Sequence, residues 1–174
     1  RRQARAGRRR PLLRGVAAGE EGVVAVVRRV AVEVLEAVLA KSPKDSVALA
    51  GLCDALEALG RTKEALDATV RLTSVDPKDP AGWARRARLA RAAGETREAL
   101  TSISRAVSLE PNRAEYLRTK RDLLMMQASY RAAADACERL VEIDPRDTEA
   151  MRVRALALER LGKLDAALEE LEVA

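Results

Sequence analysis

Apolar residues recur along most of the chain at three- and four-residue steps, which is the spacing of one face of an α-helix. The densest apolar run lies in residues 22–40, and it holds four charged side chains: Arg28, Arg29, Glu33 and Glu36. A membrane-spanning helix needs about 20 predominantly apolar residues. The run therefore predicts a packed helix, and no segment predicts insertion into a membrane.

Four prolines interrupt this pattern at a constant interval. Pro43, Pro77, Pro111 and Pro145 are spaced 34 residues apart and lie in similar contexts, KSPKD, VDPKD, LEPNR and IDPRD. Proline lacks a backbone N–H and ends a helix, and a period of this length indicates a stack of supersecondary units. The units predicted from it are residues 12–45, 46–79, 80–113, 114–147 and an incomplete 148–174.

Each unit is predicted to contain two helices. With the proline assigned to position 32, positions 4, 8 and 11 fall on one helical face, and positions 20, 24 and 27 fall on another. Position 20 is alanine in all five units: Ala31, Ala65, Ala99, Ala133 and Ala167. We expect this alanine to let the two helices approach closely, because a larger side chain there would overpack the contact at a cost of about 1–3 kcal/mol.

The segment between the two helices is predicted to be a tight turn. Glycine occupies position 15 of three units, as Gly60, Gly94 and Gly162, and suits a left-handed residue that ends the first helix. Ala128 replaces it in the fourth unit, where its Cβ carries a steric cost, so we expect that turn to differ. We also expect Thr62 and Thr96 to cap second helices, and Asp79 with Pro80 to begin a first helix.

These features resemble the tetratricopeptide repeat, a 34-residue pattern of W-x2-L-G-x2-Y followed by A, F and P. The resemblance covers about residues 29–174, with Trp83 at the Trp position. It implies an all-α fold, a right-handed α-solenoid of antiparallel helix pairs. It also implies that the first helices line a concave groove for peptides or partner helices, and hence a protein–protein interaction scaffold.

The N-terminal part departs from the pattern. Gly15, Gly19 and Gly22 each cost about 1 kcal/mol relative to Ala inside a helix. We therefore expect residues 1–21 to form an irregular basic arm. Residues 22–45 are expected to form a degenerate first repeat, mainly its second helix, as one continuous helix from about Gly22 to Lys41.

Charged residues gather on one face of the predicted first helices, at positions 2, 5, 9 and 12 with 6 and 13 at its edge. The predicted partner-binding residues are Arg85, Arg88, Arg91, Arg118, Asp122, Met125, Met126 and Arg152. One hypothesis is a groove with an acidic end, at Asp54 and Glu57, and a basic middle that binds an acidic peptide or helix. The other is a solvated charged face, which a chain with 34% charged residues also favours.

The composition argues against catalysis. The chain has no His, the commonest general base and metal ligand, and shows no phosphate-binding glycine loop or nucleophile–base pair. We expect no enzyme activity, no catalytic or metal site and no cofactor. Cys53 and Cys137 lie two units apart without a CxxC motif, so we expect buried, reduced thiols. The lack of a secretion signal favours a cytoplasmic location.

The net charge of +5 is concentrated at the N-terminus, where residues 1–14 hold seven Arg and no acidic residue. Such a segment binds nucleic acid or acidic surfaces, or it is an unstructured flank. The alternative function is therefore an RNA- or nucleic-acid-associated helical repeat that uses this arm and the stripe from Arg85 to Arg91. The interaction scaffold is the leading hypothesis, because the aromatic content of 2% provides no platform for stacking bases.

The C-terminal unit stops at Ala174, before its second helix is complete. Solenoids need capped ends, and Leu164, Leu168 and Leu171 form an apolar stripe at four- and three-residue steps. We therefore expect the natural chain to continue, or this end to self-associate or pack on another chain. The missing initial Met also suggests an excerpt of a longer protein.

Overall fold

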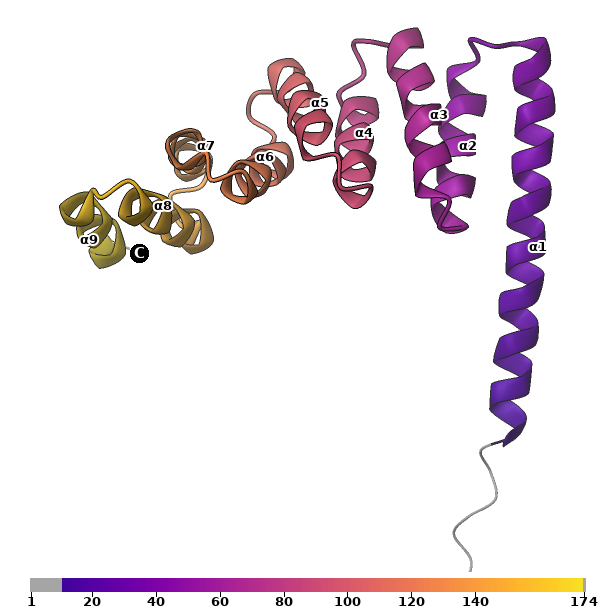
Figure 1. Ribbon diagram of the computed structural model, residues 1–174, viewed down its shortest axis with the longest axis horizontal. Coiled ribbons are helices and arrows are strands. Elements are labelled where there is room, and N and C mark those ends of the chain that lie inside the picture. Colours follow the sequence, from indigo (N-terminus) through magenta and orange to yellow (C-terminus); the bar gives the residue numbers. More distant parts are fainter. Residues whose placement is uncertain (1–10, 174) are drawn as a thin grey trace, which may run out of the picture.

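The computed structural model describes the backbone of residues 11–173 and the side chains of residues 22–169 and 172. Within this range the chain is helical and contains no strand (Figure 1), so the expected all-α fold is confirmed. The helices are α1 (Pro11–Lys41), α2 (Ser46–Ala58), α3 (Thr62–Val75), α4 (Pro80–Ala92), α5 (Thr96–Leu109), α6 (Ala114–Met126), α7 (Tyr130–Ile143), α8 (Thr148–Arg160) and α9 (Leu164–Val173).

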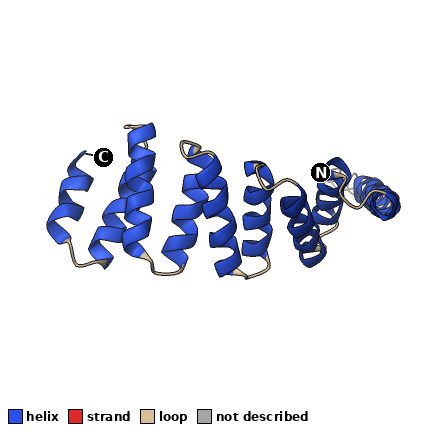
Figure 2. Cartoon of the chain, turned by 90° about the horizontal axis from the view of Figure 1, so that it is seen from above, coloured by secondary structure: helices blue, strands red, loops and turns tan. Residues whose placement is uncertain are grey.

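The helices form a single row of antiparallel pairs (Figure 2). The pairs are α2 with α3, α4 with α5, α6 with α7 and α8 with α9, and all extensive contacts join helices that are consecutive in the sequence. The row bends, with α4 and α6 on the inner side of the bend and α5 and α7 on the outer side (Figure 1). Because each pair packs only on its neighbours, the fold is an α-solenoid.

The two helices of each pair meet across the alanine at position 20. Ala65, Ala99 and Ala133 have no accessible surface, and Ala167 is buried as well. Larger apolar side chains, including Leu49 and Leu117, fill the space around these contacts. Their burial in all four pairs agrees with the expected close approach of the two helices.

The turns inside the pairs share one backbone conformation. Gly60, Gly94 and Gly162 have φ angles of 72°, 82° and 75°. Ala128 also has a positive φ, 55°, and its turn has the same hydrogen bonds, such as Ser129 N to Leu124 O at 2.9 Å. The expectation of a different turn in the fourth unit is therefore wrong. Packing of α6 on α7 sets the geometry, and the alanine adopts a strained conformation to fit it.

Aspartate caps three of the first helices. The Asp79 carboxylate accepts hydrogen bonds from Ala81 N and Gly82 N, both at 2.9 Å, and Pro80 follows it as predicted. Asp45 and Asp147 cap α2 and α8 in the same way. The prediction for Thr62 and Thr96 is wrong: each is the first helical residue, and the residue before it makes no capping bond through its side chain. The residue directly after the glycine, Arg61 or Glu95, occupies the N-cap position, so the threonine lies one residue too late to cap the helix.

Helix α1 is longer than predicted. It begins at Pro11 rather than near Gly22, so the expectation of irregular chain is wrong for residues 11–21, while residues 1–10 lie outside the described residues. Proline is favourable at a helix start, and the residues around the glycines in 12–21 are mostly Ala, Arg, Glu and Leu, which are good helix formers. Extending an existing helix requires no new nucleation, so isolated glycines are tolerated.

The strain at Ala128 predicts that a glycine there stabilises the protein. Ala128→Gly should raise the free energy of unfolding by about 1 kcal/mol, because a residue without Cβ adopts a positive φ without steric cost. Urea denaturation followed by circular dichroism measures the change. The same substitution at exposed, helical Ala132 on α7 is the control, and it should lower stability by about 0.5–1 kcal/mol. Destabilisation by both substitutions would show that Ala128 is not strained.

Candidate functional site

Helices α2, α4 and α6 carry two adjoining depressions. One lies between α4 and α6 and the other between α2 and α4, each with a volume of about 290 Å³. Ala81 and Arg85 line both, so the depressions form one continuous α2–α4–α6 groove. Its lining includes Ala50, Ala81, Ala84, Arg85, Arg88, Arg91, Arg113 and Tyr116. The acids Asp76, Asp79 and Glu115 also line the groove, so its surface combines small alanines with charges of both signs.

Three predicted binding residues, Arg85, Arg88 and Arg91, meet in this groove because they recur at three-residue steps on α4. Two of them already have acidic partners. Arg85 Nη1 lies 2.7 Å from Asp54 Oδ1, and Arg88 Nη2 lies 2.6 Å from Glu57 Oε2, both carboxylates being on α2. The expected separation into an acidic end and a basic middle is therefore wrong. Opposite charges on neighbouring first helices pair with each other across the groove.

Arg91 differs from the other two groove arginines. It is exposed, lines the depression between α4 and α6, and forms no ion pair within the described part of the chain. Across the same depression, the Arg113 guanidinium lies 5.3 Å from the centre of the Tyr116 ring and forms two long ion pairs, with Glu110 at 3.6 Å and with Glu115 at 3.7 Å. Arg88 is 58% exposed despite its ion pair. This depression therefore presents accessible cationic groups beside an aromatic ring.

The remaining predicted residues lie farther along the solenoid. Arg118 donates to Asp147 at 2.8 Å, and this bond holds the pKa of the Asp147 carboxyl below its usual range. Arg152 pairs with Glu149 at 3.2 Å. Met125 is half-buried and Met126 is 65% exposed. The structure thus places the eight predicted residues in two groups: three line the α2–α4–α6 groove and five lie beyond it.

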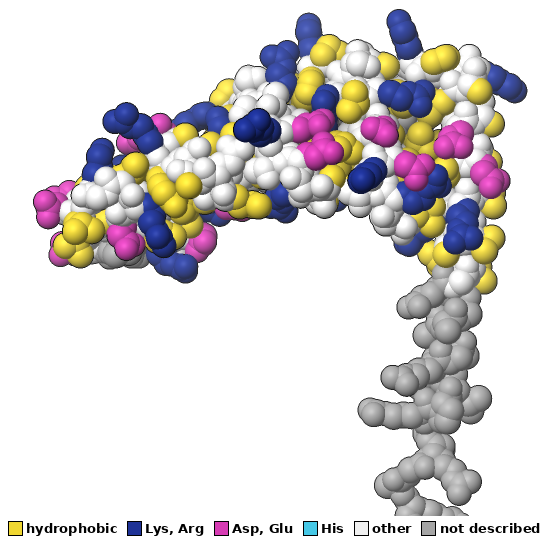
Figure 3. All heavy atoms as spheres, in the orientation of Figure 1, with side chains coloured by type: hydrophobic (Ala, Val, Ile, Leu, Met, Phe, Trp, Pro, Cys, Tyr) yellow, Lys and Arg dark blue, Asp and Glu magenta, His cyan; other side chains and the backbone are white. Residues whose placement is uncertain are grey.

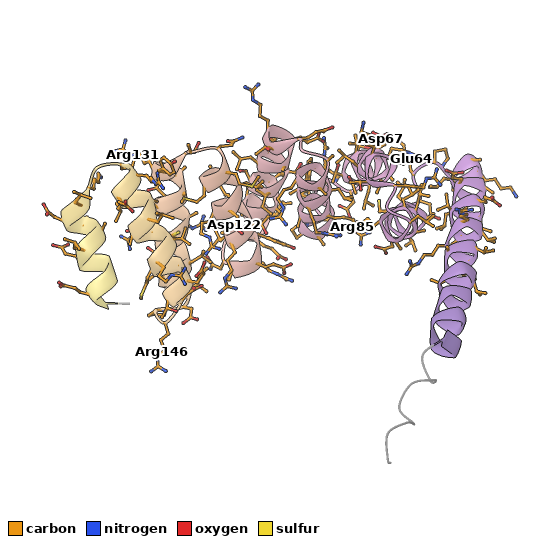
Figure 4. All side chains as sticks on the ribbon, turned by 60° about the horizontal axis from the view of Figure 1, so that its bottom comes forward. Glu64, Asp67, Arg85, Asp122, Arg131 and Arg146 are labelled. Atoms are coloured by element: carbon orange, nitrogen blue, oxygen red, sulfur yellow. The ribbon has the colours of Figure 1, made fainter. Side chains whose placement is uncertain are left out.

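Arg121 is a charged residue that the sequence analysis did not single out. Its side chain is 7% exposed, and its Nε and Nη2 atoms both donate to Asp122 Oδ1, at 2.9 and 2.8 Å. Its buried Nη1 has no hydrogen-bond partner among the described residues. Arg121 occupies position 8, where the other units have Cys53, Ala87 and Ala155. The sequence contains a signal for this residue, because a large cation occupies a position that holds a small residue in the other units. Asp122, which is labelled in Figure 4, therefore neutralises a buried charge.

The part of the chain that the structure describes offers little other reactive chemistry. Cys53 and Cys137 are buried free thiols, as predicted, and burial raises the pKa of each to about 11. Over the described residues, no three potential metal-ligating side chains are grouped to hold an ion. Over the same residues, no helix combines the length and apolarity needed to cross a bilayer.

Sequence comparison agrees with the repeat geometry. The tetratricopeptide repeat family matches residues 29–89 with one of its patterns, and residues 84–145 and 118–174 with another. The chain belongs to the tetratricopeptide repeat family. Tetratricopeptide repeats are typically non-enzymatic interaction modules, so the family supports an interaction scaffold. Comparison with curated protein sequences gives no match.

Solved tetratricopeptide repeat structures share this fold at low sequence identity. A crystal structure of MamA is 18% identical, with a TM-score of 0.74, covering 89% of this chain and 85% of MamA. YrrB, described as a TPR protein with an unusual peptide-binding site, is 18% identical with a TM-score of 0.73, covering 87% of this chain and 79% of YrrB. Naa15/Naa10 bound to HypK-THB matches at 23% identity and a TM-score of 0.67, over 80% of this chain and 21% of that one.

The buried Arg121–Asp122 pair predicts asymmetric effects of mutation in this repeat. Asp122→Ala should lower the free energy of unfolding by about 1–3 kcal/mol, because it leaves a buried guanidinium without an acceptor. Arg121→Met should be tolerated, because an apolar side chain of similar length removes the buried charge.

Denaturation of the two single variants and the double variant measures the coupling. In the Arg121→Met background, Asp122→Ala should have almost no effect on stability. An equal loss in both backgrounds would mean that Asp122 stabilises the fold by some other contact.

Proposed function

We propose that this chain is a non-enzymatic scaffold whose α2–α4–α6 groove binds an acidic peptide or helix of a partner protein. Arg91 carries the proposal. It is an exposed guanidinium without an ion pair among the described residues, and it lies on the groove that joins three first helices. A carboxylate is the group that guanidinium binds best, through two parallel hydrogen bonds.

Arg88 provides a second contact one turn away on α4. It is more than half exposed, and its ion pair with Glu57 uses only part of its five N–H donors. Only the Glu57 side of this pair is largely buried, at 18% exposed, so the free N–H donors of Arg88 remain open to a ligand carboxylate. Arg113, beside the Tyr116 ring, extends the cationic surface toward α6.

The structural neighbours support a peptide or protein ligand. YrrB is described as having a peptide-binding site, and Naa15/Naa10 is described as bound to HypK-THB. Both likenesses lie below 25% identity, so they support the class of ligand through the fold alone. The acidic character of the ligand rests on the arginines of this chain. Arg118, Asp122, Met125, Met126 and Arg152 are proposed to contact a longer partner beyond the groove.

The alternative is a nucleic-acid-associated repeat, in which phosphates take the place of carboxylates at the groove arginines. It draws on the arginine-rich residues 1–14. Phosphate binding releases counterions, so its affinity falls steeply with salt. Salt dependence and the contribution of residues 1–10 therefore distinguish the two functions.

Binding of a fluorescein-labelled peptide rich in Glu and Leu, followed by fluorescence anisotropy, tests the proposal. The wild-type chain should bind, and Arg91→Glu should weaken binding by about fivefold or more, which is about 1 kcal/mol. Arg105→Glu on the outer helix α5 is the matched control and should have no effect, because Arg105 is also exposed but lies outside the groove.

Equal affinity of the two variants would contradict the groove proposal. Binding of a single-stranded RNA oligonucleotide with a steep salt dependence, lost on removal of residues 1–10, would favour the alternative. Neither substitution should change the unfolding midpoint, because neither side chain contributes to the core.

A further inference from the structure

Helix α1 exposes a long apolar stripe. Five of its valines recur at three- and four-residue steps and are 39–64% exposed: Val23, Val27, Val30, Val34 and Val38. Figure 3 shows apolar side chains at the surface along the described part of this helix. The opposite face, with Val32 and Leu39, is buried against α2. A helix that is apolar on two opposite faces is usually covered on both.

The other repeats show what is missing from α1. Val34 is 56% exposed, whereas the residues at the same position of α3, α5 and α7 are Ala68 at 3%, Ser102 at 1% and Ala136 at 5%. Val38 is 39% exposed, and its equivalents are Leu72 at 6%, Ala106 at 0% and Leu140 at 1%. In those units, the first helix of the same pair packs antiparallel over these residues. Among the described residues, no helix occupies the corresponding place beside α1.

The residues that directly precede the stripe do not fill this place. α1 is one helix from Pro11 to Lys41, about 46 Å long, and it extends far beyond the row of repeats (Figure 1). Residues 11–22 therefore continue along the helix axis and do not turn back as an antiparallel neighbour, so they do not cover the stripe.

We propose that the stripe is covered by α1 of a second copy of this chain, packed antiparallel in a symmetric dimer. The stripe reads almost the same from either end of the helix. Val23 and Val38 are equally far from a midpoint between Val30 and Ala31, and so are Val27 and Val34. In antiparallel register, Val23 lies opposite Val38 of the second copy, and Val27 lies opposite Val34. A two-fold interface requires such self-complementarity.

The charges beside the stripe favour the same arrangement. Arg29 and Glu33 lie on one edge of α1, both are exposed, and neither forms an ion pair within the described part of the chain. In the antiparallel register, each Arg29 lies beside Glu33 of the second copy, which gives two symmetric ion pairs. A parallel register would place Arg29 level with Arg29 and Glu33 level with Glu33. Flanking charges of this kind select the orientation of paired helices.

Sedimentation equilibrium of the 174-residue chain tests the dimer. The wild type should be dimeric, and Val30→Glu should raise the dissociation constant at least tenfold while leaving the helix content unchanged, since Val30 makes no core contact. The control is Leu168→Glu on α9, where Leu164 and Leu168 are each 60% exposed and form the competing apolar stripe at the C-terminal end. This control should leave the dimer intact.

Charge reversal tests the register. Arg29→Glu should raise the dissociation constant about fivefold, and the double variant Arg29→Glu with Glu33→Arg should restore it to within about twofold, because the reversed pairs are again complementary. A double variant that stays weak would overturn the antiparallel register. A monomeric wild type, or a dimer that dissociates on Leu168→Glu and not on Val30→Glu, would overturn the proposal itself.

Discussion

The contact between two helices across an alanine governs this structure. Ala65, Ala99 and Ala133 have no accessible surface, so a larger side chain at any of them would push the two helices apart. That constraint is strong enough to impose a left-handed turn on Ala128, where the other units use glycine. Because every pair has the same geometry, the pairs stack in a regular bend. The first helices α2, α4 and α6 then lie next to one another and form the groove.

The charges of the groove depend on this stacking. Asp54 and Glu57 belong to one pair of helices and Arg85 and Arg88 to the next, and they meet only because successive first helices are adjacent. These ion pairs hold the groove side chains in place, with Glu57 largely buried and Arg88 more than half exposed. Arg91 lies one turn farther along α4, past the last acid of α2, and keeps its guanidinium accessible. The proposed binding residue Arg91 thus lies just beyond the last ion pair between α2 and α4.

Local features were predictable from the sequence, and contacts between repeats were not. The proline period, the position-20 alanine and the three glycines determine the helices and turns, and all were recognised. The partner of Arg88 could not be predicted, because it depends on the offset between α2 and α4 in the superhelix. Arg121 was missed because its position normally holds a small residue. The start of α1 was predicted too late in the sequence. Each glycine lowers helix stability, but extending a helix that has already formed needs no new nucleation and offsets that cost.

Alanine methyl NMR tests the central claim most directly, namely that a partner binds along the first helices. Ala50, Ala81 and Ala84 line the groove, whereas Ala132 lies on the outer helix α7. Titration with the Glu/Leu-rich peptide should shift the methyl signals of the first three and leave that of Ala132 unchanged. Shifts confined to outer-helix alanines, or bound peptide with no shift at Ala81 and Ala84, would contradict the assignment of the groove as the binding site.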